Sequence, residues 1–250
     1  MKVAIIGASG IVGQHMRLCV PDCVEPVWIR RTPDPITEGR DLMGAPEDHD
    51  FDCVVNLAGI SDVDMVERWK GVAYRQNVMI PEILAGLCSK GRCKFIQVST
   101  QAVYQSPGNT MAQVNEYGRQ KRRAEEITLA NNGIVVRLTF VLGIRPLPHV
   151  GRKNPLEAML EGQSPQVADR WFSPLFAWDA AELLWDAVLM AKPGEIRLLG
   201  EPIRTNRYEI ARMVNPDVKP CSHDDFPGLA PRPFDTTYRN SSHLRSINQI

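Results

Sequence analysis

A tyrosine and a lysine four residues apart are the side chains of this sequence that most directly indicate chemistry. Tyr117 and Lys121 lie in the segment NEYGRQK, and a spacing of four places two side chains on one face of a helix. A nearby ammonium group favours the phenolate, so we expect Lys121 to lower the pKa of Tyr117 from its usual value of about 10. Such a tyrosine can exchange a proton with a carbonyl or alcohol oxygen.

A threonine upstream of this pair adds a third polar group. The apolar run Phe95–Ser99 is typical of a buried strand, and Thr100 follows it directly. Ligands of open α/β sheets bind at the carboxyl ends of strands, so we expect the Thr100 hydroxyl to bond the same substrate oxygen as Tyr117. We therefore predict that Thr100, Tyr117 and Lys121 are the catalytic residues.

Three glycines near the N-terminus indicate a dinucleotide site. The strand-like run Val3–Ile6 leads into Gly7, Gly10 and Gly13, and a helical pattern begins at Ile11. The first glycine permits a tight turn, the second lets the backbone approach a pyrophosphate, and the third lets the helix pack closely on the strand. The N–H groups at the start of the helix favour phosphate. The loop therefore predicts a nicotinamide dinucleotide as cofactor.

The end of the second candidate strand, Val27–Arg30, bears on which cofactor is bound. A site selective for NAD usually has an acidic residue here for the ribose 2′-hydroxyl. This chain has Arg30 and Arg31 instead, and guanidinium groups suit a 2′-phosphate. We predict that NADP(H) is preferred, with NAD(H) as the alternative.

The pattern of the whole chain predicts the elements that must position these groups. Candidate strands alternate with helical patterns; the strands are Val3–Ile6, Val27–Arg30, Cys53–Leu57, Phe95–Ser99 and Ile134–Leu138, and the helices are Ile11–Val20, Met65–Lys90 with an interruption near Pro81, and Asn115–Asn131. This alternation is typical of βαβ units with right-handed crossovers. We predict an α/β fold with a Rossmann-like, doubly wound parallel sheet.

The character of the sequence changes after Leu142. Residues 143–171 and 193–250 are rich in proline and in loop-forming residues, whereas Trp178–Met190 has helical apolar spacing. We predict an NAD(P)-binding Rossmann core at 1–142 and 172–192, and a small C-terminal substrate-binding lobe at 143–171 and 193–250.

Composition excludes several classes of function. The chain has 250 residues, with 29 Lys plus Arg and 29 Asp plus Glu, so its formal net charge is zero. A balanced charge argues against duplex nucleic acid or an anionic membrane as a partner. The six cysteines form no C-x-x-C pair and predict reduced thiols, so no metal site is expected. Without a run of about 18 apolar residues or a signal-peptide pattern, we expect a cytoplasmic protein.

Short motifs spread over nearly the whole chain carry a family resemblance. They are GASGIVG at 7–13, NLAG at 56–59, STQAVY at 99–104, YGRQK at 117–121, RLTFVLG at 137–143 and APRP at 230–233. Together they resemble the extended short-chain dehydrogenases/reductases, and in particular the dTDP-4-dehydrorhamnose reductases and related nucleotide-sugar enzymes.

The resemblance implies two sets of contact residues. Those implied for the cofactor are Gly7, Gly10, Ile11, Val12, Gly13, Arg30, Arg31, Asn56, Ala58, Gly59, Asn77, Ser99, Tyr117 and Lys121. Those implied for a nucleotide-sugar substrate are Thr100, Gln101, Thr139 and Phe140. The diphosphate of such a substrate needs arginine or lysine; the candidates in the smaller lobe are Arg152, Lys153, Arg170 and Arg232, and of these we single out Arg232. A homodimer through the helices around 65–90 and 115–131 is left open.

Gln101 is a departure from the family pattern. The reductases usually have an acid after the Ser-Thr pair, and the same segment also resembles that of epimerases. Dehydratases of nucleotide sugars have Asp-Glu after the threonine, which Gln101 and Ala102 cannot replace as acid and base. We therefore predict an NADP(H)-dependent reductase of a keto-sugar nucleotide. The alternatives are an epimerase with tightly bound NAD(P), and a non-enzymatic subunit that senses the cofactor.

Overall fold

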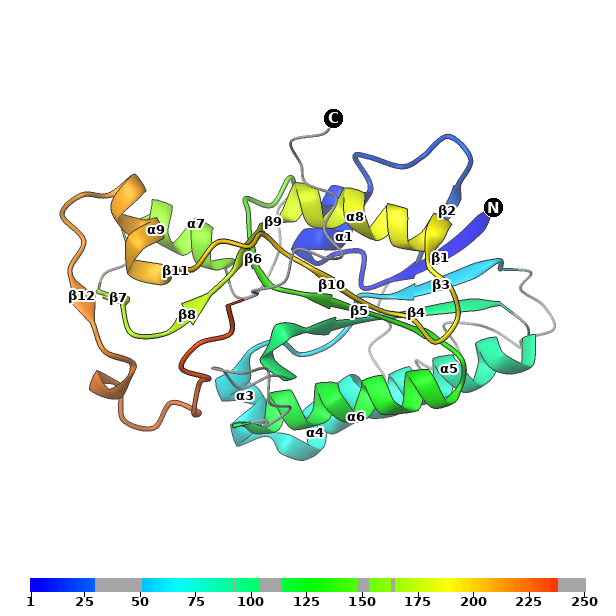
Figure 1. The fold of residues 1–250 in the computed structure, drawn as a ribbon, viewed down its shortest axis with the longest axis horizontal. Helices are drawn as coiled ribbons and strands as arrows, with labels where there is room; N and C mark the ends of the chain where they lie inside the picture. Colours follow the sequence, from blue (N-terminus) through cyan, green and yellow to red (C-terminus); the bar gives the residue numbers. More distant parts are fainter. Residues whose placement is uncertain (30–50, 92, 104–113, 148–152, 163–164, 238–250) are drawn as a thin grey trace.

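A six-stranded parallel sheet forms the centre of the molecule (Figure 1). The computed structural model describes residues 1–29, 51–91, 93–103, 114–147, 153–162 and 165–237. From edge to edge the strands are β2 (Glu25–Ile29), β1 (Lys2–Ile6), β3 (Cys53–Asn56), β4 (Lys94–Thr100), β5 (Ile134–Leu138) and β10 (Ile196–Leu199), each parallel to its neighbours. The predicted α/β fold with a doubly wound parallel sheet is confirmed.

Helices cover both faces of this sheet (Figure 1). On one face lie α1 (Ile11–Met16) and α8 (Ala177–Met190); on the other lie α3 (Val63–Arg68), α4 (Lys70–Tyr74), the π-helix η1 (Arg75–Met79), α5 (Ile80–Gly91) and α6 (Glu116–Ala130). Alternate strand residues serve the two layers: Val3 and Ile5 join the apolar cluster beneath α8, whereas Ala4 and Ile6 join the cluster beneath α5. Burial on both faces explains the continuous apolar runs.

The helix predicted at Met65–Lys90 is divided into several parts. Its predicted interruption near Pro81 is present as the π-helix η1, which ends two residues before that proline. Because proline has no N–H group, the Asn77 carbonyl cannot receive an α-helical bond from position 81, and a wider turn accommodates this. The α1 helix is also shorter than predicted, because it ends at Met16 and not at Val20.

A smaller set of elements extends beyond the carboxyl edge of the sheet, and we call it the lobe. Its elements are β6 (Phe140–Leu142), α7 (Pro155–Leu160), β7 (Gln166–Val167), β8 (Trp171–Phe172), β9 (Pro174–Phe176), β11 (Thr205–Asn206), α9 (Arg207–Val214), β12 (Pro220–Cys221) and η3 (His223–Asp225). The strands pair two by two, as β6 with β9, β7 with β12, and β8 with β11. No helix in the described ranges is long and apolar enough to cross a membrane.

The strand β10 lies where the sequence predicted the lobe. Ile196–Leu199 pairs in parallel with β5 and forms the edge of the central sheet. Its sequence IRLL includes a charged residue, and only Leu199 is fully buried, so it lacks the continuous apolar run of an inner strand. The predicted boundary at residue 193 therefore separates this strand from its own sheet.

Candidate active site

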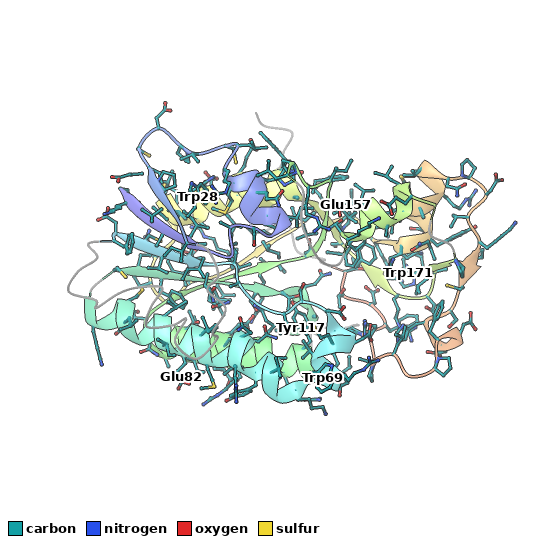
Figure 2. The ribbon with its side chains drawn as sticks, turned by 180° about the vertical axis from the view of Figure 1, so that it is seen from behind. Trp28, Trp69, Glu82, Tyr117, Glu157 and Trp171 are labelled. Carbon is teal, nitrogen blue, oxygen red and sulfur yellow. The ribbon has the colours of Figure 1, made fainter. Side chains whose placement is uncertain are left out.

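Thr100 and Tyr117 meet at the carboxyl end of β4. Thr100 is the last residue of β4, Tyr117 lies in the first turn of α6, and the Thr100 side chain is close enough to the phenol to influence its pKa. Asn115 caps this helix by accepting a bond from the Gly118 backbone N–H at 2.9 Å, which fixes where α6 begins. Figure 2 shows Tyr117 between the sheet and the helices on its α6 face. The structure thus brings together two of the three predicted catalytic residues.

The environment of Tyr117 differs from the prediction. Burial raises the pKa of its phenol to about 12, and the Thr100 side chain offsets only part of that rise. The prediction that Lys121 lowers this pKa is wrong for this structure. The physical reason is that removing water from around the phenol disfavours the phenolate more than its neighbours stabilise it.

Lys121 lies one helical turn after Tyr117 and is buried. Its Nζ donates to the backbone carbonyl of Val98 at 2.7 Å, so the ammonium group is held against β4. Burial lowers its pKa to about 8, and the negative charge of Glu125 opposes this shift. The side chain therefore carries its charge at neutral pH and loses it under mildly alkaline conditions.

A buried ion pair lies behind these residues and was not predicted. Glu125 is fully buried and accepts from Arg137 Nε at 2.9 Å, from Arg137 Nη2 at 2.7 Å, and from Ser99 Oγ at 2.6 Å. Two signals in the sequence could have revealed it. Glu125 follows Lys121 by four residues on the same helix, and Arg137 is a charge within an apolar strand, which requires a partner. Ser99, predicted to contact the cofactor, has its hydroxyl directed at this pair.

The glycine loop fits closely against the loop that follows β3. A Cβ atom on Gly7, whose φ is +86°, would lie 2.6 Å from the Ala58 backbone nitrogen, and one on Gly13 would lie 2.6 Å from the Ala8 Cα. Only glycine can occupy these positions. A Cβ on Gly10 would meet nothing nearer than the Gly7 carbonyl at 3.4 Å. Protein packing therefore does not require Gly10 to be glycine, and close approach of a pyrophosphate would account for it.

Two buried asparagines hold the second loop of this cradle. Asn56 Oδ1 accepts from the Ala58 backbone N–H at 3.1 Å, and its amide group donates to Gln97 at 2.9 Å. Asn77 Oδ1 accepts from the Ile60 N–H at 2.8 Å, and its Nδ2 donates to the Ile60 carbonyl at 3.1 Å. Both side chains thus shape the loop around Gly59. The predicted contacts of Asn56, Asn77, Ala58 and Gly59 with a cofactor stay predictions.

Ile11 and Val12 are the first two residues of α1, directly after the N-cap residue Gly10. Gln14, in the same helix, donates to the Ser9 carbonyl at 2.9 Å and accepts from the Leu147 N–H at 2.9 Å, so it ties the glycine loop to the start of the lobe. Arg30 and Arg31 lie outside the described residues. The preference for NADP(H) over NAD(H) therefore stays a prediction.

The predicted substrate residues lie in different surroundings. Thr139 is buried against Gly200, where a Cβ would approach its side chain to 2.2 Å. Phe140 stacks on Phe172, with their ring centroids 4.0 Å apart. Arg232 donates to Asp64 Oδ2 at 2.7 Å and to the Ala230 carbonyl at 2.6 Å, which joins the C-terminal part of the described chain to α3.

Comparison with known proteins gives consistent results. The family model described as the RmlD substrate binding domain matches residues 1–249. The dTDP-4-dehydrorhamnose reductase of Mycobacterium tuberculosis (strain ATCC 25618 / H37Rv) is 26% identical over 92% of this chain and 82% of that protein. A "probable low-salt glycan biosynthesis reductase Agl14" of Haloferax volcanii is 32% identical over 44% of this chain and 40% of its own length.

Solved structures show the same fold. The crystal structure of dTDP-4-dehydrorhamnose reductase from Bacillus anthracis in complex with NADP has a TM-score of 0.79 at 19% identity, and covers 96% of this chain and 90% of that one. The orthologue from Clostridium acetobutylicum has a TM-score of 0.79 at 22% identity, with 96% and 90% covered. At these identities the likeness concerns the fold.

Proposed function

Because the chain belongs to the family of the RmlD substrate binding domain, among the NAD(P)-dependent reductases of the extended short-chain type, we propose that it reduces the keto group of a nucleotide sugar with NADP(H). The resemblance seen in the sequence motifs is confirmed at the level of the family. The proposal goes further, since it assigns the substrate class, the preferred cofactor and the residues that act. A keto sugar attached to dTDP is the first substrate to test, given the relatives that the chain matches.

One observation carries the proposal: Thr100 ends β4, and its side chain is close enough to Tyr117 on α6 to influence the pKa of the phenol. The glycine loop follows β1, two strands away in the same parallel sheet, so both features lie at the same edge. Chain order reverses around β1, whose neighbours are β2 and β3, and this reversal creates the crevice in which such sheets bind dinucleotides. Hydroxyl groups next to a dinucleotide site are suited to hydride transfer to a carbonyl.

Tyr117 and Thr100 both act on the oxygen of the carbonyl group. When bound, the nicotinamide supplies the hydride. Tyr117, with a pKa of about 12, is protonated at neutral pH and can donate its proton to the oxygen of the reduced carbonyl. Thr100 donates a hydrogen bond to the same oxygen and holds it in place.

Lys121 supports this arrangement from one turn along α6. Its ammonium group has three N–H bonds, and one of them is used by the Val98 carbonyl. The remaining two can bind the hydroxyl groups of a nicotinamide ribose. Because its pKa is about 8, we expect turnover to fall as the pH rises through that value.

The test is a direct assay with dTDP-4-dehydrorhamnose and either NADPH or NADH, followed by the absorbance of the reduced nicotinamide. We expect consumption of NADPH in proportion to substrate, and a higher kcat/KM with NADPH than with NADH. Cofactor retained through purification, with no net consumption of added NADPH, would instead favour epimerisation. A sensing role would be favoured if the Tyr117→Phe variant still binds a protein partner and the wild-type protein binds no sugar nucleotide.

A further inference from the structure

A glutamine beside the candidate catalytic threonine has one end of its amide without a hydrogen bond. Gln101 begins the short 3-10 helix η2 (Gln101–Val103), directly after Thr100, and is only 6% exposed. Its Nε2 donates to Thr236 Oγ1 at 3.0 Å, whereas its buried Oε1 has no partner among the residues that the structure describes. A buried acceptor without a hydrogen bond is unfavourable. This oxygen therefore indicates a donor that a ligand brings.

The direction of the amide follows from the bonds of Thr236. Its backbone N–H and its hydroxyl both donate to the Trp171 carbonyl, at 2.9 and 3.3 Å. A hydroxyl group has a single proton to donate, so Thr236 Oγ1 can only accept from Gln101. In this arrangement the NH₂ end of the amide faces Thr236, and the oxygen end is left for another donor.

The segment that carries Thr236 is itself fixed by the lobe. The Trp171 N–H donates to the Phe234 carbonyl at 2.9 Å, and Trp171 and Asp235 form a β-bridge. The Asp235 carboxylate accepts from Arg204 Nε at 3.0 Å, and the Arg204 guanidinium lies 3.6 Å from the centre of the Trp171 ring. Figure 1 shows this last described segment, in red, returning from the lobe toward the sheet. Thr236 is thus a fixed point and not a loose neighbour of Gln101.

We propose that Thr236 is a positioning residue, which holds Gln101 Oε1 as an uncharged acceptor for a hydroxyl group of the sugar near its keto carbon. The inference rests on the proposed function, since the keto oxygen is assigned to Thr100 and Tyr117. A keto group has no proton to donate, whereas the hydroxyl groups of a sugar ring do. An amide does not ionise, so Gln101 binds without taking part in proton transfer. Specificity for the sugar is thereby set by a contact between the catalytic strand and the lobe.

The experiment compares three variants, Gln101→Met, Thr236→Val and Thr236→Ser. For each, KM and kcat are measured with dTDP-4-dehydrorhamnose and NADPH, and the Kd of dTDP-rhamnose is measured by calorimetry on protein saturated with NADP. We expect Gln101→Met to raise KM and Kd by about 10- to 100-fold, the value of one buried hydrogen bond. Thr236→Val should raise both by a smaller factor, because the amide loses its fixed direction, and Thr236→Ser should restore them. The Kd of NADPH should stay unchanged in all three.

The other possible results distinguish failure of this inference from failure of the proposed function. Unchanged KM and Kd in Gln101→Met and Thr236→Val would overturn this inference and leave the proposed function standing. Equal losses in Thr236→Val and Thr236→Ser would show that bulk, and not the hydroxyl, matters at this position, which also overturns it. If the wild-type protein consumes no NADPH but binds dTDP-rhamnose in a Gln101-dependent way, the reductase function fails and the contact stands. No binding of dTDP-rhamnose to the wild-type protein overturns both.

Discussion

The core and the lobe of this molecule are stabilised in different ways. Beneath the helices of the core lie two large clusters of buried apolar side chains, one on each face of the sheet. Among the residues that the structure describes, the lobe has one small cluster, formed by Met159, Ala211 and Val218 with two partly buried neighbours. Apart from the stacked rings of Phe140 and Phe172, many of its other contacts are polar, such as the Arg145–Glu157 ion pair and the hydrogen bonds from Ser222 and His223 to Asp169.

This difference separates the tasks of the two regions. Proton transfer needs atoms held to a fraction of an ångström, and the candidate catalytic residues lie on β4 and α6, which pack in the core. Recognition of a polar ligand needs polar groups whose bonds a ligand can replace or extend, and the lobe supplies these. The Gln101–Thr236 contact joins the two regions at the proposed site.

The largest expected effect tests whether the chemistry belongs to the core. Tyr117→Phe removes the proton donor and keeps the ring, so we expect kcat to fall by about 10²- to 10⁴-fold. The Kd of NADPH, measured by nicotinamide fluorescence, should change little, because the cradle around Gly7 and Ala58 is untouched. Turnover close to wild type would mean that the proton comes from elsewhere, and the assignment of the chemistry to β4 and α6 would fail.

The second prediction compares one buried ion pair with one in the lobe. Arg137→Met removes the bidentate partner of Glu125 from a pair whose side chains are 5% and 0% exposed, and leaves the carboxylate with the longer contact from Arg122 at 3.4 Å and the bond from Ser99. We expect the free energy of unfolding in urea to fall by about 3–5 kcal/mol. Arg145→Met breaks the pair with Glu157, whose side chains are 10% and 16% exposed, and should cost about 1–3 kcal/mol. If both variants lost the same free energy of unfolding, the buried ion pair of the core would not be more important for stability than the ion pair of the lobe.

The same distinction explains what the sequence could predict. The inner strands are buried on both faces, so Val3–Ile6 and Ile134–Leu138 appear as continuous apolar runs, and the predicted boundaries differ from the observed ones by a residue or so. The glycine loop and the Tyr117–Lys121 spacing are local patterns and could also be recognised. Strands of two residues in the lobe leave no period in the sequence, and β10 is a partly charged edge strand.

Contacts between residues that lie far apart in the sequence could not be predicted, for a different reason. Arg232 was predicted to bind a diphosphate, yet its guanidinium lies on Asp64, 168 residues earlier in the chain. Thr236 was not singled out at all, although it contacts Gln101 across 135 residues. The lowered pKa expected for Tyr117 was wrong because spacing reports which charges are near, but not how much water burial removes. The partner of a charged side chain and the extent to which burial removes water from it both depend on the tertiary structure.

The third prediction uses pH to loosen the lobe before the core. The Arg145 guanidinium lowers the pKa of Glu157 from 4.5 to about 2. A carboxylate with a lower pKa in the folded state stabilises the fold above its unfolded value and loses that effect as the pH falls toward 2. We expect the protection of the α7 amides against hydrogen exchange, relative to their intrinsic exchange rates, to fall between about pH 4.5 and 2. The protection of α6 should stay unchanged over the same range. The Glu157→Gln variant should show reduced protection of α7 already at pH 7. If α6 and α7 lose protection together as the pH falls, the prediction that the lobe opens before the core is wrong.

The smallest expected effect concerns the tie between the lobe's C-terminal segment and α3. Arg232 and Asp64 form an ion pair at 2.7 Å whose side chains stay 23% and 25% exposed. Partly exposed pairs contribute about 1 kcal/mol or less, so Arg232→Met and Asp64→Asn should each lower the free energy of unfolding by about that amount. The double variant should lose hardly more than either single one, because both remove the same contact. A coupling above about 3 kcal/mol would show that one ion pair fixes the lobe as firmly as packing fixes the core. In that case the lobe could not exchange its polar contacts for those of a ligand, and recognition would have to lie in the core beside Thr100 and Tyr117.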